Sequence, residues 1–323
     1  MSEIEFRQAI RDAIAEEMDR DDRVVLFGED VAFAGGVFQA TRGLYEMHGP
    51  SRVFDTPISE LALAGAAFGG AITGLRPVIE IMFGDFLPLA MDSLVNQSAK
   101  YWFVSNEQQS VPLVVRSAVG GGGGFAAIHS QIPAPWFMAV PGLKIVAPAT
   151  PADAKGLLKA AIRDDNPVLF LEHKRLYSQK GHVGEGVTAI GSAAIVRPGT
   201  DVTIATTMIG VHHALEAGTL LAERGIDAEV LDLRTLRPLD LPMILESAAR
   251  TRRLVVVEEG PHTGGWSAEV LARVSEAAFG ELEAVWRLTA PDLPLPYSPP
   301  LESAFLPGTE AIVASVSERL EKL

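Results

Sequence analysis

Residues 144–172, KIVAPATPADAKGLLKAAIRDDNPVLFLE, contain two apolar runs separated by a segment with helical spacing. We predict a strand at Lys144–Ala147, a helix at Ala152–Arg163 and a second strand at Val168–Glu172. The strands are short, mostly apolar and separated by a helix, which is typical of parallel strands that are covered on both faces. This unit therefore predicts an α/β fold built on a parallel sheet.

The same alternation extends along the rest of the chain. A helix is expected from a capping box of Ser2 and Glu5, and further helices are expected from about Glu60 and from about Leu87 to Phe103. The other predicted strands are Val24–Phe27, Val78–Phe83, Val111–Ser117, Val202–Ala205, Ala228–Leu231, Leu254–Val257 and Val285–Leu288. Ser178–Thr188 has three glycines and little apolar material. We therefore predict two open, mostly parallel-sheet α/β domains in series, at residues 1–177 and 195–323, with a linker at residues 178–194.

The composition excludes several classes of protein. Over 323 residues the net charge is −14, which argues against a nucleic-acid partner because phosphate backbones attract clustered Lys and Arg. Without cysteine there is no disulfide, no thiolate nucleophile and no Cys-ligated metal. The N-terminal helix has no apolar signal core, and Leu61–Leu75 is too short for a membrane span and indicates a buried helix. We expect a cytoplasmic protein with no membrane partner.

The glycine run Gly120–Gly124 does not fit a dinucleotide-binding fingerprint. Phe125 stands where the third glycine is required, and prolines follow where a helix is required. No acidic residue lies between Phe125 and Ala152 to bind a ribose. The run is either a flexible turn or a place where the backbone approaches a ligand closely. There is also no P-loop, no Gly-x-Ser-x-Gly and no His-Glu-x-x-His, and His212-His213 is expected to be a surface pair.

Six short segments remain, and together they carry a resemblance. They are Gly28-Glu29-Asp30-Val31, Asp55-Thr56-Pro57-Ile58-Ser59-Glu60, His129-Ser130-Gln131, Pro141-Gly142-Leu143-Lys144, Ala161-Ile162-Arg163-Asp164-Asp165-Asn166-Pro167 and Pro296-Tyr297-Ser298-Pro299-Pro300-Leu301-Glu302. In their order and spacing they resemble the β subunits of thiamine-diphosphate-dependent 2-oxoacid and acetoin dehydrogenases, which belong to the transketolase-like superfamily. The resemblance covers essentially the whole chain.

The resemblance implies that the active site is divided between two chains. The first domain would bind the aminopyrimidine ring of thiamine diphosphate, and the second, transketolase C-terminal-like domain would assist dimer assembly. A separate α subunit would hold the diphosphate and Mg²⁺ through a Gly-Asp-Gly…Asn motif, and this sequence has no Gly-Asp-Gly. The chain would therefore act in an α2β2 heterotetramer and transfer acyl groups to a lipoyl-bearing acyltransferase core.

Glu60 is the residue to which the resemblance gives the central role. Its carboxylate would hydrogen-bond the pyrimidine ring nitrogen and favour the imino tautomer, whose exocyclic nitrogen then takes the proton from the thiazolium carbon. Without the resemblance, Glu60 would be an ordinary first-turn acid that complements a helix dipole. Phe86 and Ile58 would form apolar walls of the pyrimidine pocket, although core packing explains Phe86 almost as well. Glu29 would belong to the acidic network around the cofactor.

His129 matches the family's catalytic histidine. It would donate or orient a proton while the acyl group passes to lipoamide, whereas a lone loop histidine is more commonly just solvated. Relatives often have a Glu-Ala pair soon after this motif, and this chain has Ile132–Trp136 instead. The backbone after His129 and the substrate preference are therefore expected to differ.

The segment that ends in Asp165-Asn166-Pro167 resembles the family's potassium site. The carbonyl oxygens of Leu113, Ala161, Ile162 and Asp164, together with Asn166, would surround K⁺, since oxygen ligands suit such a hard cation. The alternative is a turn in which the residue before proline is held extended.

Several functions stay open at this stage. The favoured one is oxidative decarboxylation of a 2-oxoacid, either pyruvate or a branched-chain acid. Acetoin dehydrogenase is an alternative, as is a non-catalytic binding or scaffold subunit. A thiamine-dependent enzyme of sugar phosphates is less favoured, because such enzymes usually carry the diphosphate motif on the same chain.

Overall fold

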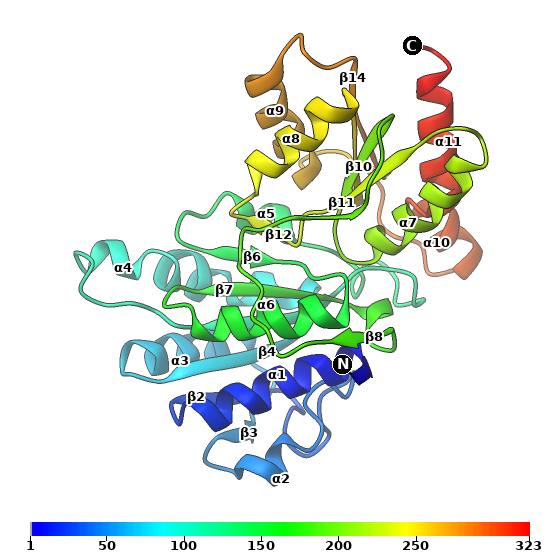
Figure 1. The fold of residues 1–323 in the computed structure, drawn as a ribbon. Helices are drawn as coiled ribbons and strands as arrows, with labels where there is room; N and C mark the ends of the chain where they lie inside the picture. Colours follow the sequence, from blue (N-terminus) through cyan, green and yellow to red (C-terminus); the bar gives the residue numbers. More distant parts are fainter. Residues whose placement is uncertain (1) are drawn as a thin grey trace.

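The larger of two sheets has the strand order β12-β6-β7-β5-β4-β2-β3 in the computed structural model, which describes residues 2–323 (Figure 1). Its strands are β2 (Val24–Gly28), β3 (Val53–Asp55), β4 (Arg76–Phe83), β5 (Val114–Val119), β6 (Lys144–Val146), β7 (Val168–His173) and β12 (Thr235–Arg237). All neighbouring strands are parallel except β12, which pairs antiparallel with β6. The predicted strand–helix–strand unit is confirmed as β6, α6 (Pro151–Arg163) and β7.

Local sequence explains how α6 forms between these strands. Thr150 caps its N-terminus, because its side chain accepts a hydrogen bond from the Asp153 backbone at 3.1 Å. Pro151 occupies the first turn, where a missing N–H costs nothing. Leu157 and Leu158 are fully buried, and the helix packs against α1 (Phe6–Arg20). The burial of this face and of all six residues of β7 makes the unit part of the first core.

The second sheet has the order β14-β13-β10-β11-β9. Its strands are β9 (Ala194–Arg197), β10 (Val202–Thr206), β11 (Ala228–Asp232), β13 (Arg253–Pro261) and β14 (Ala284–Ala290). The helices that accompany it are α7 (Ile209–Ala222), α8 (Leu241–Thr251), α9 (Trp266–Ala278), α10 (Pro299–Phe305) and α11 (Thr309–Leu320). In Figure 1, α8 and α9 lie on the opposite side of this sheet from α7 and α11. The four strands predicted here are confirmed, and β9 is an additional antiparallel edge strand.

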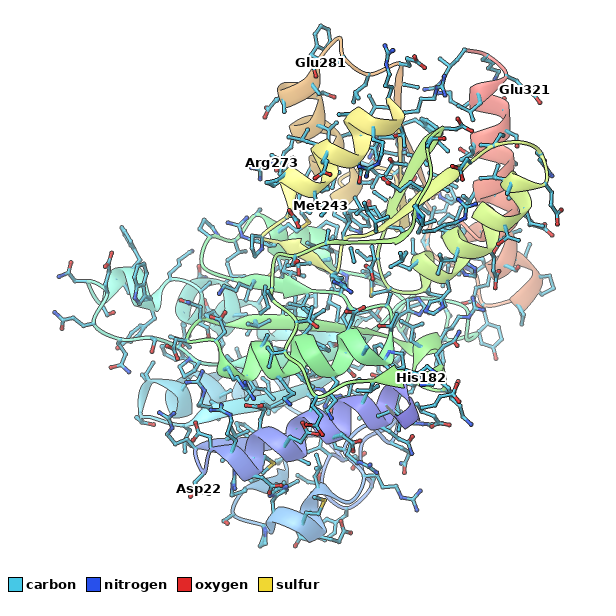
Figure 2. The ribbon with its side chains drawn as sticks, in the orientation of Figure 1. Asp22, His182, Met243, Arg273, Glu281 and Glu321 are labelled. Atoms are coloured by element: carbon cyan, nitrogen blue, oxygen red, sulfur yellow. The ribbon has the colours of Figure 1, made fainter. Side chains whose placement is uncertain are left out.

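Two short pairings connect distant parts of the chain. Inside the predicted linker, β8 (Lys180–Val183) pairs antiparallel with β1 (Ser2–Glu5), so that His182 lies beside the start of α1 (Figure 2). In addition, β12 comes from the second half of the sequence but joins the edge of the first sheet. The predicted capping box of Ser2 and Glu5 is wrong, since Ser2 belongs to β1 and the box is formed by Glu5 and Gln8.

The long helix predicted from residue 87 to 103 is also wrong. The segment contains a 3-10 helix, η1 (Gly84–Ala90), a π-helix, η2 (Asp92–Ser98), and a short α4 (Tyr101–Val104). Pro88 lies inside η1, where it has no N–H to donate, and this favours a break in the helix. Both η1 and η2 pack against α3 (Glu60–Ile72). The break places residues 84–90 next to the helix that begins at Glu60.

Helix α3 is buried on one side only. Leu63, Ala64 and Ala67 are buried, whereas Leu61 is 56% exposed. The expectation of a buried helix is therefore correct only for the face that carries Leu63, Ala64 and Ala67. Within residues 2–323, no helix is both long and apolar enough to cross a membrane.

A charged cluster lies inside the first sheet. Arg116 on β5 is fully buried and donates to Glu80 on β4 at 2.8 Å and to Glu172 on β7 at 2.7 and 2.9 Å. Tyr177 donates its hydroxyl proton to Glu172 at 2.8 Å. Burial raises the pKa of Glu80, and Arg116 only partly opposes that rise. The cluster is sealed within the core, so each member depends on the others for its hydrogen bonds.

Candidate active site

Two acidic residues meet at one edge of the first sheet. Strands β2 and β3 are parallel neighbours, and their last residues, Gly28 and Asp55, lie opposite each other. Glu29 directly follows β2, and Glu60 is the first residue of α3. Both side chains are buried, with 7% of each residue exposed. The edge is the carboxyl end of parallel strands, where ligands of open α/β sheets bind.

The charges at this edge are poorly compensated by the chain itself. Burial raises the pKa of Glu29, and the nearby Glu60 and Asp30 carboxylates raise it further, against a hydrogen bond from the Ser59 backbone. The Oε1 atom of Glu29 and the Oγ1 atom of Thr56 are buried without a hydrogen-bond partner. Buried polar atoms normally have one, so these oxygens are available to a polar ligand.

The polar groups at this edge complement those of an aminopyrimidine ring. Such a ring offers an amino group and, when protonated, a ring N–H, and both are donors. The acceptors at this edge are the carboxylates of Glu29 and Glu60 and the hydroxyl of Thr56. The donor and acceptor sets are therefore complementary.

Phe86 and His129 also come together. Phe86 lies in η1, and the loop after the glycine run brings the His129 ring to 5.4 Å from it, measured between centroids, at 80°. Phe83, at the end of β4, lies 4.8 Å from His129 at 89°. The three rings form an edge-to-face cluster, an arrangement that aromatic rings prefer. His129 is thus held by packing and is not simply a solvated loop residue.

Lys174 completes the surroundings of His129. It belongs to η3 (Lys174–Leu176), donates to the carbonyl oxygen of His129, and lies 4.6 Å above the centroid of the Phe125 ring. Burial lowers the pKa of Lys174 to about 8, although acidic groups including Asp85 and Glu259 oppose the shift. A partly neutral lysine next to His129 therefore exists at moderately alkaline pH.

Other predicted residues lie apart from these two groups. Ile58 is 82% exposed. The cavities of about 610, 940 and 470 Å³ have linings that include neither Glu60 nor His129.

The segment predicted to bind K⁺ already contacts a positive charge. Arg76 donates to the carbonyl oxygen of Ile162 at 2.9 Å and to that of Asp164 at 2.6 Å. The carbonyl oxygens of Leu113 and Ala161 accept backbone N–H groups at 2.8 and 3.2 Å, and Asn166 donates to the Asp164 side chain. Each carbonyl retains a second lone pair. Arg76 therefore already donates to two of the five groups expected to bind the ion.

Several residues of the site were not predicted from the sequence. Thr56 belongs to the segment Asp55–Glu60, but nothing in the sequence marks its hydroxyl as a ligand-binding group. Phe83 is not distinguishable from any other apolar strand residue. Lys174 is a basic residue directly after a buried strand, which only weakly indicates a functional position. The prediction that His212-His213 is a surface pair holds only in part, because both residues are half-buried. His212 hydrogen-bonds the Ala149 carbonyl at 2.8 Å and His213 the Thr309 hydroxyl at 3.3 Å. Over residues 2–323, no three His, Cys, Asp or Glu side chains are grouped to hold a metal.

Comparison with known families matches both halves of the chain. Residues 2–180 match the family described as transketolase, pyrimidine binding domain, and residues 191–312 match the transketolase C-terminal domain. A solved split-gene transketolase, described as an inactive β4 tetramer, has the same fold with a TM-score of 0.81 at 23% identity, covering 98% of this chain and 97% of its own.

Similar proteins from three bacteria align over nearly the whole chain. The β subunit of acetoin:2,6-dichlorophenolindophenol oxidoreductase from Cupriavidus necator is 44% identical, and the alignment covers 98% of this chain and 98% of that subunit. The 2-oxoisovalerate dehydrogenase β subunit of Bacillus subtilis is 45% identical over 99% of this chain and 100% of its own. The pyruvate dehydrogenase E1 component β subunit of Rhizobium meliloti is 44% identical, over 98% of this chain and 70% of its own.

Proposed function

This chain belongs to the transketolase-like family of β subunits of 2-oxoacid and acetoin dehydrogenases, and we propose that it supplies the half of the active site that activates thiamine diphosphate. The reaction is the oxidative decarboxylation of a 2-oxoacid with transfer of the acyl group to a lipoyl group. The observation that carries the proposal is the buried Glu60–Glu29 pair with an unpaired oxygen at the carboxyl edge of the sheet.

The residues of this chain would act on protons. When bound, thiamine diphosphate supplies the carbon nucleophile and the electron sink. Glu60 would hold a proton at the pyrimidine ring nitrogen, while Glu29, whose pKa is raised by burial and by Glu60, would accept from the same ligand or keep a proton itself. Phe86 and Ile58 would pack against the ring. His129 would donate or orient a proton at the lipoyl sulfur.

The remaining parts of the site would come from partners. The relatives are named as β subunits, and we assign the diphosphate and Mg²⁺ to an α subunit because this chain lacks the Gly-Asp-Gly motif. The exposure of Ile58 supports a site that a second chain completes. The lipoyl group would come from an acyltransferase core, and we place the complex in the cytoplasm.

The first prediction concerns assembly. The purified chain should show no 2-oxoacid decarboxylation with thiamine diphosphate and Mg²⁺, and it should gain activity when an α subunit converts it to an α2β2 heterotetramer. The measurement is reduction of an artificial electron acceptor by the chain, the α subunit and the pair, with size determined by light scattering. Turnover by the chain alone would show that its site is complete. A tight pair without thiamine-dependent turnover would indicate the non-catalytic scaffold.

Acetoin is the second candidate substrate, because the similar Cupriavidus necator protein is named for it. The same assay with pyruvate, branched-chain 2-oxoacids and acetoin separates the candidates by their kcat/KM values. A preference for acetoin would keep the roles of Glu60 and His129 but replace decarboxylation with cleavage of acetoin.

We also propose a K⁺ ion at the carbonyl oxygens of Leu113, Ala161, Ile162 and Asp164, with Asn166. Arg76 donates one hydrogen bond to each of the carbonyl oxygens of Ile162 and Asp164, so the ion would bind the remaining lone pair of each oxygen. The second prediction follows from this. A ligand that binds only the native state stabilises it by about 2.7 kcal/mol at 100 times its Kd.

The melting temperature in K⁺ should therefore exceed that in tetramethylammonium, which is too large for such a site, at equal ionic strength. The measurement is differential scanning calorimetry of the heterotetramer in both salts. Identical melting curves would contradict the ion and leave Arg76 as the cation that holds this segment.

A further inference from the structure

The loop that carries His129 is held at its two ends. It comprises residues 120–131, and the Gly120 backbone N–H donates to the carbonyl of Gln131 at 3.5 Å. The second end of the loop packs on the first domain through the rings of Phe83, Phe86 and His129. Gln131 also donates to Asp85 at 2.9 Å. The first end is the glycine run, which lies beside His173 and Arg175 of the first domain and donates N–H groups to carboxylates of the second domain.

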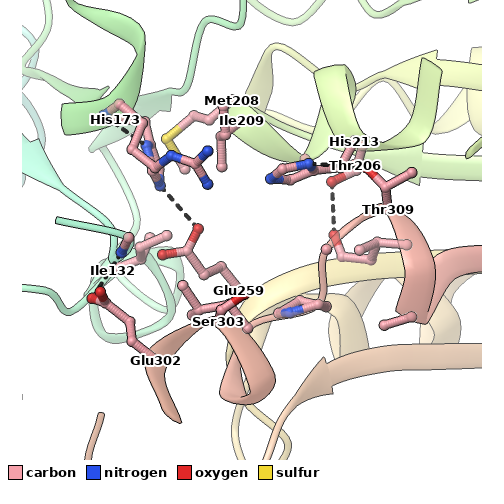
Figure 3. A pocket seen from close by; sticks show the side chains of 18 of the residues that line it. Ile132, His173, Thr206, Met208, Ile209, His213, Glu259, Glu302, Ser303 and Thr309 are labelled. Carbon is pink, nitrogen blue, oxygen red and sulfur yellow. Dashed lines mark hydrogen bonds and ion pairs between the residues drawn. The ribbon is translucent and has the colours of Figure 1, made fainter. Parts of the chain in front are cut away.

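Two carboxylates of the second domain bind the glycine run. Glu302 on α10 accepts the N–H of Gly122 at 2.8 Å and that of Gly124 at 3.0 Å, one on each oxygen. Glu259 on β13 accepts the N–H of Gly121. Both carboxylates lie at the cavity of about 610 Å³ between the domains (Figure 3). Neither takes part in the chemistry assigned above to the cofactor.

The glycines are required for this geometry. Gly120, Gly122 and Gly124 have φ values of +88°, +84° and +70°, in the left-handed region that favours glycine. Alternation of this conformation turns successive N–H groups toward one side and creates an anion-binding concavity. A Cβ on Gly120 would lie 2.1 Å from the His173 ring. The close backbone approach considered from the sequence is thus made to protein groups.

His173 connects the same contact to the first sheet. It is fully buried at the end of β7, and its Nε2 lies 2.9 Å from Glu259 (Figure 3). Its Nδ1 accepts the Arg175 N–H at 3.3 Å, so the proton belongs on Nε2, which donates to Glu259. Burial by itself raises the pKa of Glu259, but His173 and the Gly121 N–H keep it below its usual value. Glu259 is therefore an ionised acceptor.

We propose that Glu302 is a positioning residue for His129: its carboxylate fixes the glycine run and thereby the loop that places His129 against Phe86. Glu259 has the supporting role of holding Gly121 and His173. The second domain would then set the geometry of a catalytic group that it does not itself carry. The role assigned to His129 comes from the proposed function, on which this inference rests.

The experiment is made on the reconstituted heterotetramer with Glu302→Gln. The amide NH2 cannot accept, so one of the two glycine N–H groups loses its partner and the charge is lost from both bonds. Amide hydrogen exchange in peptides covering residues 120–131 should become about 10- to 100-fold faster. The matched control is Glu310→Gln, whose exposed carboxylate borders the same cavity, and it should leave exchange unchanged.

A second readout separates positioning from general support. A displaced His129 should lower acyl transfer to the lipoyl group by about 10²-fold, and decarboxylation with an artificial acceptor by less. His129→Ala should show the same split. Glu302→Asp keeps the charge but is one methylene shorter, so its losses should be intermediate. If Glu302→Gln does not assemble, Glu302→Asp is measured in its place.

Unchanged exchange of residues 120–131 in an assembled Glu302 variant would overturn the proposal. Equal losses in both half-reactions would also overturn it, since they would make Glu302 a general structural residue. If the unaltered pair had no thiamine-dependent activity, the proposed function would be wrong. Amide exchange would still test by itself whether Glu302 holds the loop.

Discussion

Glu60→Gln should reduce 2-oxoacid turnover by the heterotetramer by about 10² to 10⁴-fold, the usual contribution of a positioned acid–base group. Gln can still hydrogen-bond a ring nitrogen, but it cannot hold or release the proton there. Both half-reactions require the deprotonated thiazolium carbon, so slow proton loss limits the flux through every later step. The rates of both half-reactions should therefore decrease by the same factor. Binding of thiamine diphosphate, followed by calorimetry, should change much less than kcat.

The control addresses the alternative that Glu60 merely complements a helix dipole. Glu310 occupies the first turn of α11, as Glu60 does in α3, but it is exposed and lines a cavity that includes neither Glu60 nor Glu29. Glu310→Gln should cost about 0.3–1 kcal/mol of stability or less and leave turnover unchanged. If the two variants behaved alike, Glu60 would be a structural first-turn acid.

Arg116→Met should be the most destabilising of the predicted changes. It leaves the carboxylates of Glu80 and Glu172 buried without their cation, and removing one partner of a buried ion pair typically costs about 3–5 kcal/mol. Urea unfolding monitored by circular dichroism measures the loss. Arg273→Met is the control. Arg273 is exposed, and its ion pair with Glu269 is long, at 3.8 Å, so its loss should change stability by about 0.5 kcal/mol or less.

The pH dependence of this defect has a definite sign. Burial already raises the pKa of Glu80 with Arg116 present, and without Arg116 the Glu80 carboxyl should bind its proton more tightly in the folded than in the unfolded state. Stability then falls as pH rises above the unfolded pKa of about 4.3. The deficit of Arg116→Met should therefore be larger at pH 8 than at pH 5.5. A deficit independent of pH would mean that the lost cation is not what destabilises the variant.

The sequence predicted the parallel core well because its signals are local. Short apolar runs separated by helices specify β2, β4, β6, β7 and the central strands of the second sheet. Strands β1, β3, β8, β9 and β12 were missed because each has only three or four residues and is a strand only through its pairing with another segment. The break between η1 and η2 was missed because apolar spacing continued across Pro88.

For the site, motifs predicted residues but not their neighbours. The proximity of Glu29 to Glu60 follows from the pairing of β2 with β3, which no local pattern encodes. The contact of Phe86 with His129 depends on a loop whose conformation is set from the second domain. Arg76 reaches Ile162 across 86 positions of sequence, so the competition for the predicted potassium ligands was invisible before the fold was known.

Proton exchange at the thiazolium carbon of bound thiamine diphosphate tests the central claim most directly. It should be measured by quenched-flow NMR with this chain alone, the α subunit alone, the pair, and the pair containing Glu60→Gln. Fast exchange is expected only in the unaltered pair, with a rate at least about 10²-fold lower in the other three samples. Exchange in the Glu60→Gln pair as fast as in the unaltered pair would contradict the account, since the carboxylate at the edge of the first sheet would then have no part in activating the cofactor.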